Sequence, residues 1–119
     1  MVAFRIAALM AALGVVLGAF GSHGLKDRVT DPHLLEVWQT ASRYHLIHAL
    51  AMGLAALHPG RPGWPVWLFL AGIVIFSGSL YTMTLTGARW LGAITPIGGV
   101  CFIAGWLALA FASWPESTP

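Results

Sequence analysis

The stretch that decides the fold is SRYHLIHALAMG, residues 42–53, which places two histidines and a tyrosine at the head of an otherwise apolar run. On a helix with about 3.6 residues per turn, His45, His48 and Met52 fall on one side and a row of leucines falls on the other. Leucine side chains suit lipid, so we expect both histidines to point into a bundle of helices. Ala41 belongs to the histidine side, and the leucine row consists of Leu46, Leu50, Leu54 and Leu57.

The composition is that of an integral membrane protein. Only 8% of the 119 residues are charged and 58% are hydrophobic, whereas about a quarter of the residues in soluble domains are charged. The mean hydropathy is +0.79. Six lysines and arginines against four acidic residues are too small and too scattered an excess for nucleic-acid binding. The single cysteine, Cys101, excludes an intrachain disulfide, and no Cys/His spacing typical of a metal site is present in the sequence.

Four apolar segments predict an all-α protein with four transmembrane helices in an up-down bundle. They cover residues 2–20, 44–57, 64–85 and 90–114. A spanning helix needs about 20 apolar residues, so the second segment is short by itself. The first segment is similar to a signal peptide but has a longer apolar part, and we expect it to be retained. The sequence contains no internal repeat and no second domain, so residues 1–119 form a single domain.

The residues before the second segment, TDPHLLEVWQTASR at 30–43, supply the start of its helix. Asp31 is suited to the N-cap and Pro32 to the first helical position. Apolar residues form one stripe along this stretch and polar residues lie opposite, which is typical of a helix in the membrane interface. We expect an interfacial amphipathic segment that either runs straight into residues 44–57 or bends near Arg43. Its apolar stripe consists of Leu34, Leu35, Trp38 and Ala41.

The distribution of basic residues predicts the orientation in the membrane. With four spans, both termini and the HPGRPG link lie on one side, and the other two links lie on the opposite side. The side with the termini carries Arg5 and Arg61, and the other side carries Lys26, Arg28, Arg43 and Arg89. Lysine and arginine are enriched on the cytoplasmic side, so we expect both termini outside the cytoplasm.

Polar side chains from all four segments are expected at one membrane level. Ser77, Tyr81 and Thr84 share a face of the third helix, and we expect this face to meet the histidines. The corresponding face of the fourth helix consists of Thr95, Gly99, Phe102 and Trp106. The resulting candidate ligand-binding site consists of His23, Tyr44, His45, His48, Ser77, Tyr81 and Thr95.

Pro96, within GAITPIGG, has two interpretations. It either interrupts the fourth helix or starts it, with Thr95 as the cap and a re-entrant turn before it. Either arrangement leaves backbone groups near the polar layer that need hydrogen-bond partners.

Four blocks in the chain resemble a known family. They are GAFGSHGL, WQTASRYHLIHALAMG, FSGSLYTMTLTGARWLGAITPIGG and FIAGW, and their order and spacing cover nearly the whole chain. They are similar to the YgdD-like family, also called domain of unknown function 423, which includes the eukaryotic transmembrane protein 256. The resemblance implies a small integral protein of bacterial inner membranes with about four spans. It implies no activity and no catalytic residues, and Ser22 departs from the usual GAFGAHGL block.

Several kinds of chemistry remain open for the polar layer. His45 and His48 could share a metal ion or haem with His23, but no carboxylate or thiolate accompanies them. Tyr81 beside His48 could donate to a quinone. A proton-coupled transporter would need one of these histidines as its ionisable group, because all four acidic residues lie in links or tails.

An enzyme is disfavoured because no acid is placed to orient a catalytic histidine next to Ser77 or Ser79. We therefore interpret the chain as a binding or assembly protein of the membrane, without a committed cofactor. Its immediate partner is the lipid bilayer, and its further partner is either a second copy or a larger membrane complex. A small transporter or a quinone- or metal-binding protein is the alternative.

Overall fold

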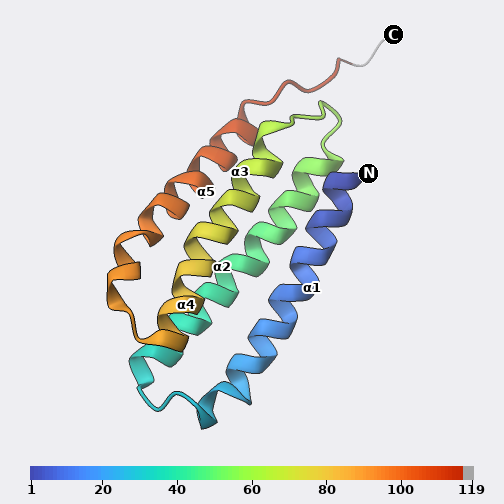
Figure 1. The fold of residues 1–119 in the computed structure, drawn as a ribbon. Helices are drawn as coiled ribbons and strands as arrows, with labels where there is room; N and C mark the ends of the chain where they lie inside the picture. Colours follow the sequence, from blue (N-terminus) through green and yellow to red (C-terminus); the bar gives the residue numbers. More distant parts are fainter. Residues whose placement is uncertain (117–119) are drawn as a thin grey trace.

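A computed structural model describes residues 1–116 of the chain. All regular secondary structure in these residues is helical (Figure 1). The first two long helices are α1 (Val2–Ser22) and α2 (Pro32–Leu57). A third continuous rod consists of α3 (Trp64–Gly72), the π-helical turn η2 (Ile73–Ser77) and α4 (Gly78–Thr86). The last helix is α5 (Thr95–Ala110), and short 3₁₀ turns, η1 (Leu25–Asp27) and η3 (Arg89–Ala93), precede α2 and α5.

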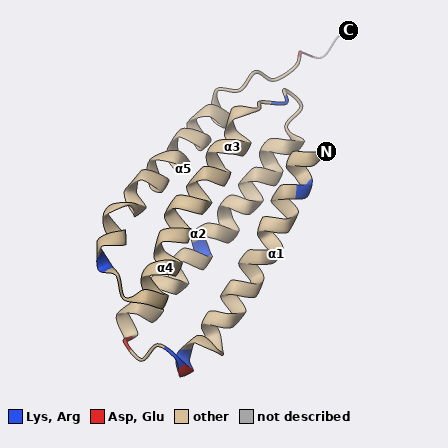
Figure 2. Cartoon of the chain, viewed as in Figure 1, with Lys and Arg blue, Asp and Glu red and all other residues tan. Residues whose placement is uncertain are grey.

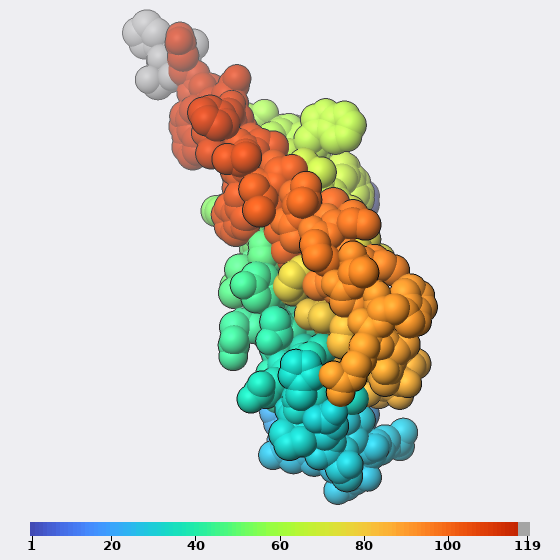
Figure 3. Space-filling view, turned by 90° about the vertical axis from the view of Figure 1, so that its left-hand side faces the viewer, coloured from blue at the N-terminus to red at the C-terminus, as the bar shows by residue number. Residues whose placement is uncertain are grey.

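The helices lie side by side in chain order, with α2 between α1 and the third rod (Figure 1). On the other side of that rod, α5 packs on α3 and η2. The described chain is a long, flattened array whose principal extents are 62, 26 and 18 Å. Viewed from the α5 side, α5 covers the upper part of the flank and the first half of α2 is visible below it (Figure 3). The start of α1 and the end of α5 lie at the same end of the array (Figure 1).

Three of the helices are long and apolar enough to cross a membrane. They are Val2–Ser22, Trp64–Thr86 and Arg89–Ala110. At 26 residues α2 has the length, but its histidines and other polar residues keep it below the apolar level of the other three. Length and composition therefore identify a membrane protein with three apolar helices, and the crossing of the membrane by α2 stays a prediction.

The stretch before the second apolar segment is the first half of one continuous α2. The Asp31 side chain accepts a hydrogen bond from the backbone N–H of His33 at 2.9 Å, and Pro32 occupies the first turn, as the sequence predicts. The helix continues through Arg43 without a break, which is the first of the two predicted arrangements. Trp38 is buried, and Leu34 packs beside Leu80 and Met83 of α4. The apolar stripe thus contacts protein, and a separate interfacial segment is not confirmed.

Pro96 starts α5 and does not interrupt it. Ile94 is the N-cap, Pro96 lies in the first turn, and the residues before it form the 3₁₀ turn η3. The Thr95 hydroxyl donates to the Leu91 carbonyl at 3.2 Å, so a side chain helps to satisfy the backbone where the two helices join.

Glycines and phenylalanines interlock where α5 meets the third rod. A Cβ atom at Gly98 would collide with the backbone of Phe76, and one at Gly72 would collide with the Phe102 ring. At Gly105 the nearest atom, in the Phe69 ring, would lie 2.7 Å away. Small residues allow helices in membranes to approach closely, and here Gly72 and Gly105 each receive a phenylalanine ring while Gly98 admits the backbone of Phe76.

The buried face of α5 differs slightly from the predicted one. It runs through Thr95, Gly98, Phe102 and Gly105, whereas Gly99 lies at its edge and Trp106 is 40% exposed. The close approach to Phe76 decides this difference, because only a residue without a side chain fits at position 98.

Candidate functional site

His45 joins three helices near the middle of α2. Its ring is 1% exposed, so it lies on the inward face of α2, as the helical periodicity predicts. Its Nε2 lies 2.8 Å from the Met10 carbonyl oxygen of α1, and its Nδ1 lies 3.0 Å from the Tyr81 hydroxyl of α4. A carbonyl oxygen only accepts, so Nε2 carries the proton and Nδ1 accepts the one from Tyr81.

The third rod turns its polar face toward α2, as predicted. The Ser77 hydroxyl donates to the Ala41 carbonyl at 2.8 Å, and the Thr84 hydroxyl shares its proton between the Leu34 carbonyl at 3.1 Å and the Leu80 carbonyl of its own helix at 3.0 Å. Ser77 is the last residue of the π-helical turn and is fully buried. These bonds fasten the third rod to the backbone of α2, on both sides of Tyr81.

His48 belongs to a neighbouring aromatic cluster on the α5 side of α2. Its Nδ1 lies 2.8 Å from the Tyr44 carbonyl, and its Nε2 accepts from the Trp106 indole N–H at 3.1 Å. The imidazole stacks on the Phe102 ring with centroids 3.6 Å apart and planes 10° apart. The ring is 4% exposed and is therefore held by two hydrogen bonds and one stacked ring.

Of the other residues of the predicted site, Tyr44 lies beside the histidines and Thr95 does not. The Tyr44 ring is 40% exposed and stacks beside His48 and Phe102. Thr95 is buried on the opposite side of the third rod, where its hydroxyl lies 2.6 Å from that of Ser79. Ser77 and Tyr81 of the third rod therefore lie against α2, which carries Tyr44, His45 and His48. Thr95 instead forms a separate contact between α4 and α5.

His23 does not join this group. It is exposed at the C-cap of α1, about 20 Å along that helix from Met10 at about 1.5 Å per residue. The expectation that it would lie level with the other histidines was wrong. It assumed that the histidines begin the second span, whereas α2 starts at Pro32 and carries them near its middle.

Three side chains of this region were absent from the predicted site. Ser42 lies 3.4 Å from the Tyr81 hydroxyl, Ser79 pairs with Thr95, and Trp106 donates to His48. Trp106 stood on the predicted face of the fourth helix, and Ser42 lies three positions before His45, so spacing could have suggested both. The Met10 carbonyl has no counterpart in a sequence pattern because every residue carries one.

The geometry limits what these histidines can do. In the described arrangement both ring nitrogens of each are used within the protein, so neither offers a lone pair to a metal ion or a proton to a quinone carbonyl. Within residues 1–116, no three His, Cys, Asp or Glu side chains are grouped to hold a metal, and every buried side-chain polar atom has a partner. The network is built to hold helices together.

Replacing His45 with alanine should destabilise the protein more than replacing Leu50 with alanine. His45→Ala removes the hydrogen bonds to the Met10 carbonyl and the Tyr81 hydroxyl and leaves that hydroxyl only the longer contact with Ser42 at 3.4 Å, which costs about 1–3 kcal/mol. Leu50 is 71% exposed, so its truncation should change the free energy of unfolding by about 0.5 kcal/mol or less. Reversible unfolding in detergent measures both, and equal losses at the two positions would contradict the assignment of the inward face.

Comparison with known proteins agrees with the resemblance seen in the sequence. The family model described as Protein of unknown function (DUF423) matches residues 17–99. A UPF0382 membrane protein of Staphylococcus epidermidis is 46% identical over 112 residues, which cover 91% of both chains. The UPF0382 membrane protein YwdK of Bacillus subtilis is 44% identical over 114 residues, which cover 91% of this chain and 92% of YwdK.

A UPF0382 membrane protein of Schizosaccharomyces pombe is 43% identical over 92% of this chain and 98% of its own. No solved structure matches the chain significantly. The matches span nearly the full length and include both bacterial and fungal proteins. The chain therefore belongs to the DUF423 family, whose relatives carry the name UPF0382 membrane protein and have no assigned activity.

Proposed function

We propose that this chain is a four-span accessory protein of the bacterial inner membrane, which works by packing against other membrane helices. The observation that supports this role best is the saturated polar network around His45 and His48. Its groups are all engaged in joining α1, α2, α4 and α5. A scaffold needs such fixed internal contacts, whereas a catalyst or proton carrier needs a group that is free to exchange partners.

The proposal includes α2 as the fourth span. Its 26 residues are about 39 Å long at about 1.5 Å per residue, which exceeds the hydrocarbon thickness of about 30 Å. Its histidines point toward α1, the third rod and α5, so their polarity is shielded from lipid. Trp64 and Trp90 are strongly exposed near opposite ends of the third rod, where interfacial aromatic side chains anchor a membrane protein.

Arg43 weakens the charge bias that favours external termini. It is exposed about 17 Å along α2 from Pro32, and Figure 2 shows one basic position midway along this helix, with other charges toward the ends. A long arginine side chain in this place bends toward the helix N-terminus and the membrane surface. Without Arg43 the comparison is Lys26, Arg28 and Arg89 against Arg5 and Arg61, which still favours the termini outside.

Reporters fused separately to the two termini test the span number and the orientation together. A reporter that is active only in the cytoplasm should be inactive at both ends. Activity at both ends would reverse the orientation while keeping an even number of spans. Activity at one end only would contradict the crossing by α2.

The outer face of α1 is the surface that we propose for assembly. Only 11% of the apolar stretch of α1 is buried, against 44% of that of the third rod. Leu9, Val15 and Val16 are well exposed on this face, and Ala12 lies among them as a small exposed residue. Partner helices in a membrane prefer such mixed faces, because small residues allow their backbones to approach.

A bulky residue on this face should prevent assembly without unfolding the chain. Ala12→Trp projects a large ring outward, where lipid tolerates it and a packed helix does not. Val100→Trp is the matched control because Val100 is 64% exposed on α5. Native mass spectrometry of the tagged chain from mild detergent should find a stoichiometric protein partner for the wild type and Val100→Trp, and its loss for Ala12→Trp. Monomers of all three would contradict the assembly role.

A further inference from the structure

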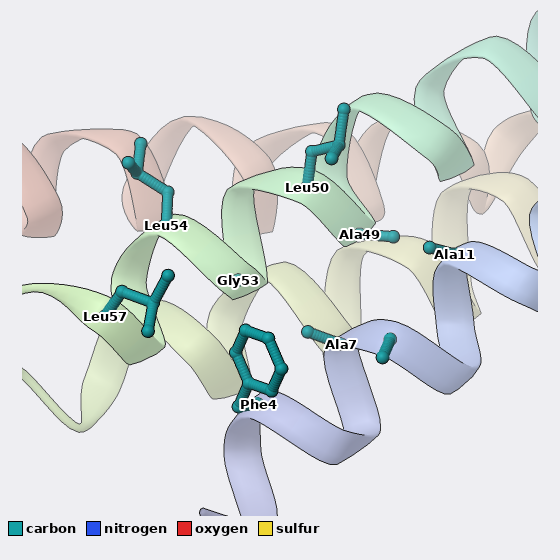
Figure 4. A pocket seen from close by; sticks show the side chains of 9 residues that line it. Phe4, Ala7, Ala11, Ala49, Leu50, Gly53, Leu54 and Leu57 are labelled. Carbon is teal, nitrogen blue, oxygen red and sulfur yellow. The ribbon is translucent and has the colours of Figure 1, made fainter.

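A groove runs between α1 and α2 on the outer surface of the helix array. It encloses about 380 Å³, and every side chain that lines it is apolar. Small residues, Ala7, Ala11, Ala49 and Gly53, lie between the larger Phe4 and Leu50 (Figure 4). In a membrane protein such a channel faces the acyl chains of the bilayer, and its narrow floor suits one chain better than a helix about 10 Å wide.

Gly53 has no packing partner that explains it. It lies in the interior of α2, where glycine costs about 0.5–1 kcal/mol relative to alanine. Other described residues place no heavy atom within 4 Å of the position that a Cβ atom would take. The other helical glycines of the α1–α2 contact behave differently, since a Cβ at Gly14 would lie 2.7 Å from Leu46. The space in front of Gly53 is therefore open to an external group.

A second cavity of about 630 Å³ lies at the end of the array that contains the chain termini. Arg61 and His58 line it, and its lining contains no acidic residue among those described. His58 Nδ1 accepts from the Gly60 N–H at 2.9 Å, so a neutral His58 ring carries its proton on Nε2 and can donate it. Gly63, at the N-cap of α3, also lines the cavity, near backbone N–H groups that the first helical turn leaves free.

The two openings share the lining residue Leu57 and are therefore neighbours. An apolar groove beside a cavity with cationic and N–H groups matches an amphipathic molecule with a negatively charged head. We infer that the groove and the end cavity together bind one anionic phospholipid, with an acyl chain over Gly53 and the phosphate at Arg61. A guanidinium binds phosphate with charge-assisted hydrogen bonds, and this preference distinguishes the site from unselective lipid contact.

Native mass spectrometry of the full chain, titrated with phosphatidylglycerol, phosphatidylcholine or inorganic phosphate, tests this site. The wild type should retain one phosphatidylglycerol in preference to phosphatidylcholine. Arg61→Gln removes the charged partner of the phosphate and should weaken retention about tenfold. Gly53→Leu fills the groove and should weaken retention of the same lipid by a similar factor. Arg43→Gln and Gly78→Leu are the matched controls, because Arg43 lies midway along α2 and Gly78 is another helical glycine with open space around it.

The outcomes separate the competing occupants. Unchanged phosphatidylglycerol retention in both Arg61→Gln and Gly53→Leu would overturn the inference. Displacement of the lipid by inorganic phosphate, with no effect of Gly53→Leu, would replace the lipid with a free anion. A shift between monomer and dimer in Gly53→Leu, with lipid retention unchanged, would assign the groove to a second copy. Arg61 lies in the link before α3, so its variant tests the head-group contact even if Gly53→Leu fails to fold.

Discussion

The imidazole of His45 bridges the Met10 carbonyl of α1 and the Tyr81 hydroxyl of α4, and it does so from the helix that lies between them. The imidazole and the hydroxyl would be costly in a bilayer if either faced lipid alone. The bridge therefore fixes the rotation of α2 about its axis, because any other rotation exposes an imidazole. With that rotation set, His48 comes to lie on Phe102, and Leu50, Leu54 and Leu57 of the leucine row face outward.

The bridge is possible because the backbones of neighbouring helices approach closely at glycines. Gly14 of α1 leaves room for His45 and Leu46 of α2, and Gly98 of α5 admits the backbone of Phe76. The polar groups can be satisfied inside only because the helices come so near to one another. In the described residues the groups of the internal network are all engaged with one another. The surfaces to which we assign function by proposal are therefore external: the outer face of α1 and the two openings that share Leu57.

Much of this arrangement follows from local sequence. The cap at Asp31 and the inward face of α2 depend on spacing and turn chemistry, and these are visible in a single chain, whereas the sequence left open whether Pro96 interrupts or begins the last helix. The membrane level of each residue is different, because it depends on where helices begin and how they slide past one another. His23 was misplaced for that reason, and Arg43 proved to lie well inside α2. The Met10 carbonyl and the choice of Gly98 over Gly99 depend on backbone contacts between helices, which no periodicity encodes.

The hydrogen bond between His45 and Tyr81 should stabilise the contact between α2 and α4. A double-mutant cycle with His45→Ala and Tyr81→Phe, measured by reversible unfolding in the same detergent, isolates that link. We expect a coupling of about 0.5–2 kcal/mol, in the range found for hydrogen bonds between membrane helices. Strictly additive effects of the two substitutions would contradict it.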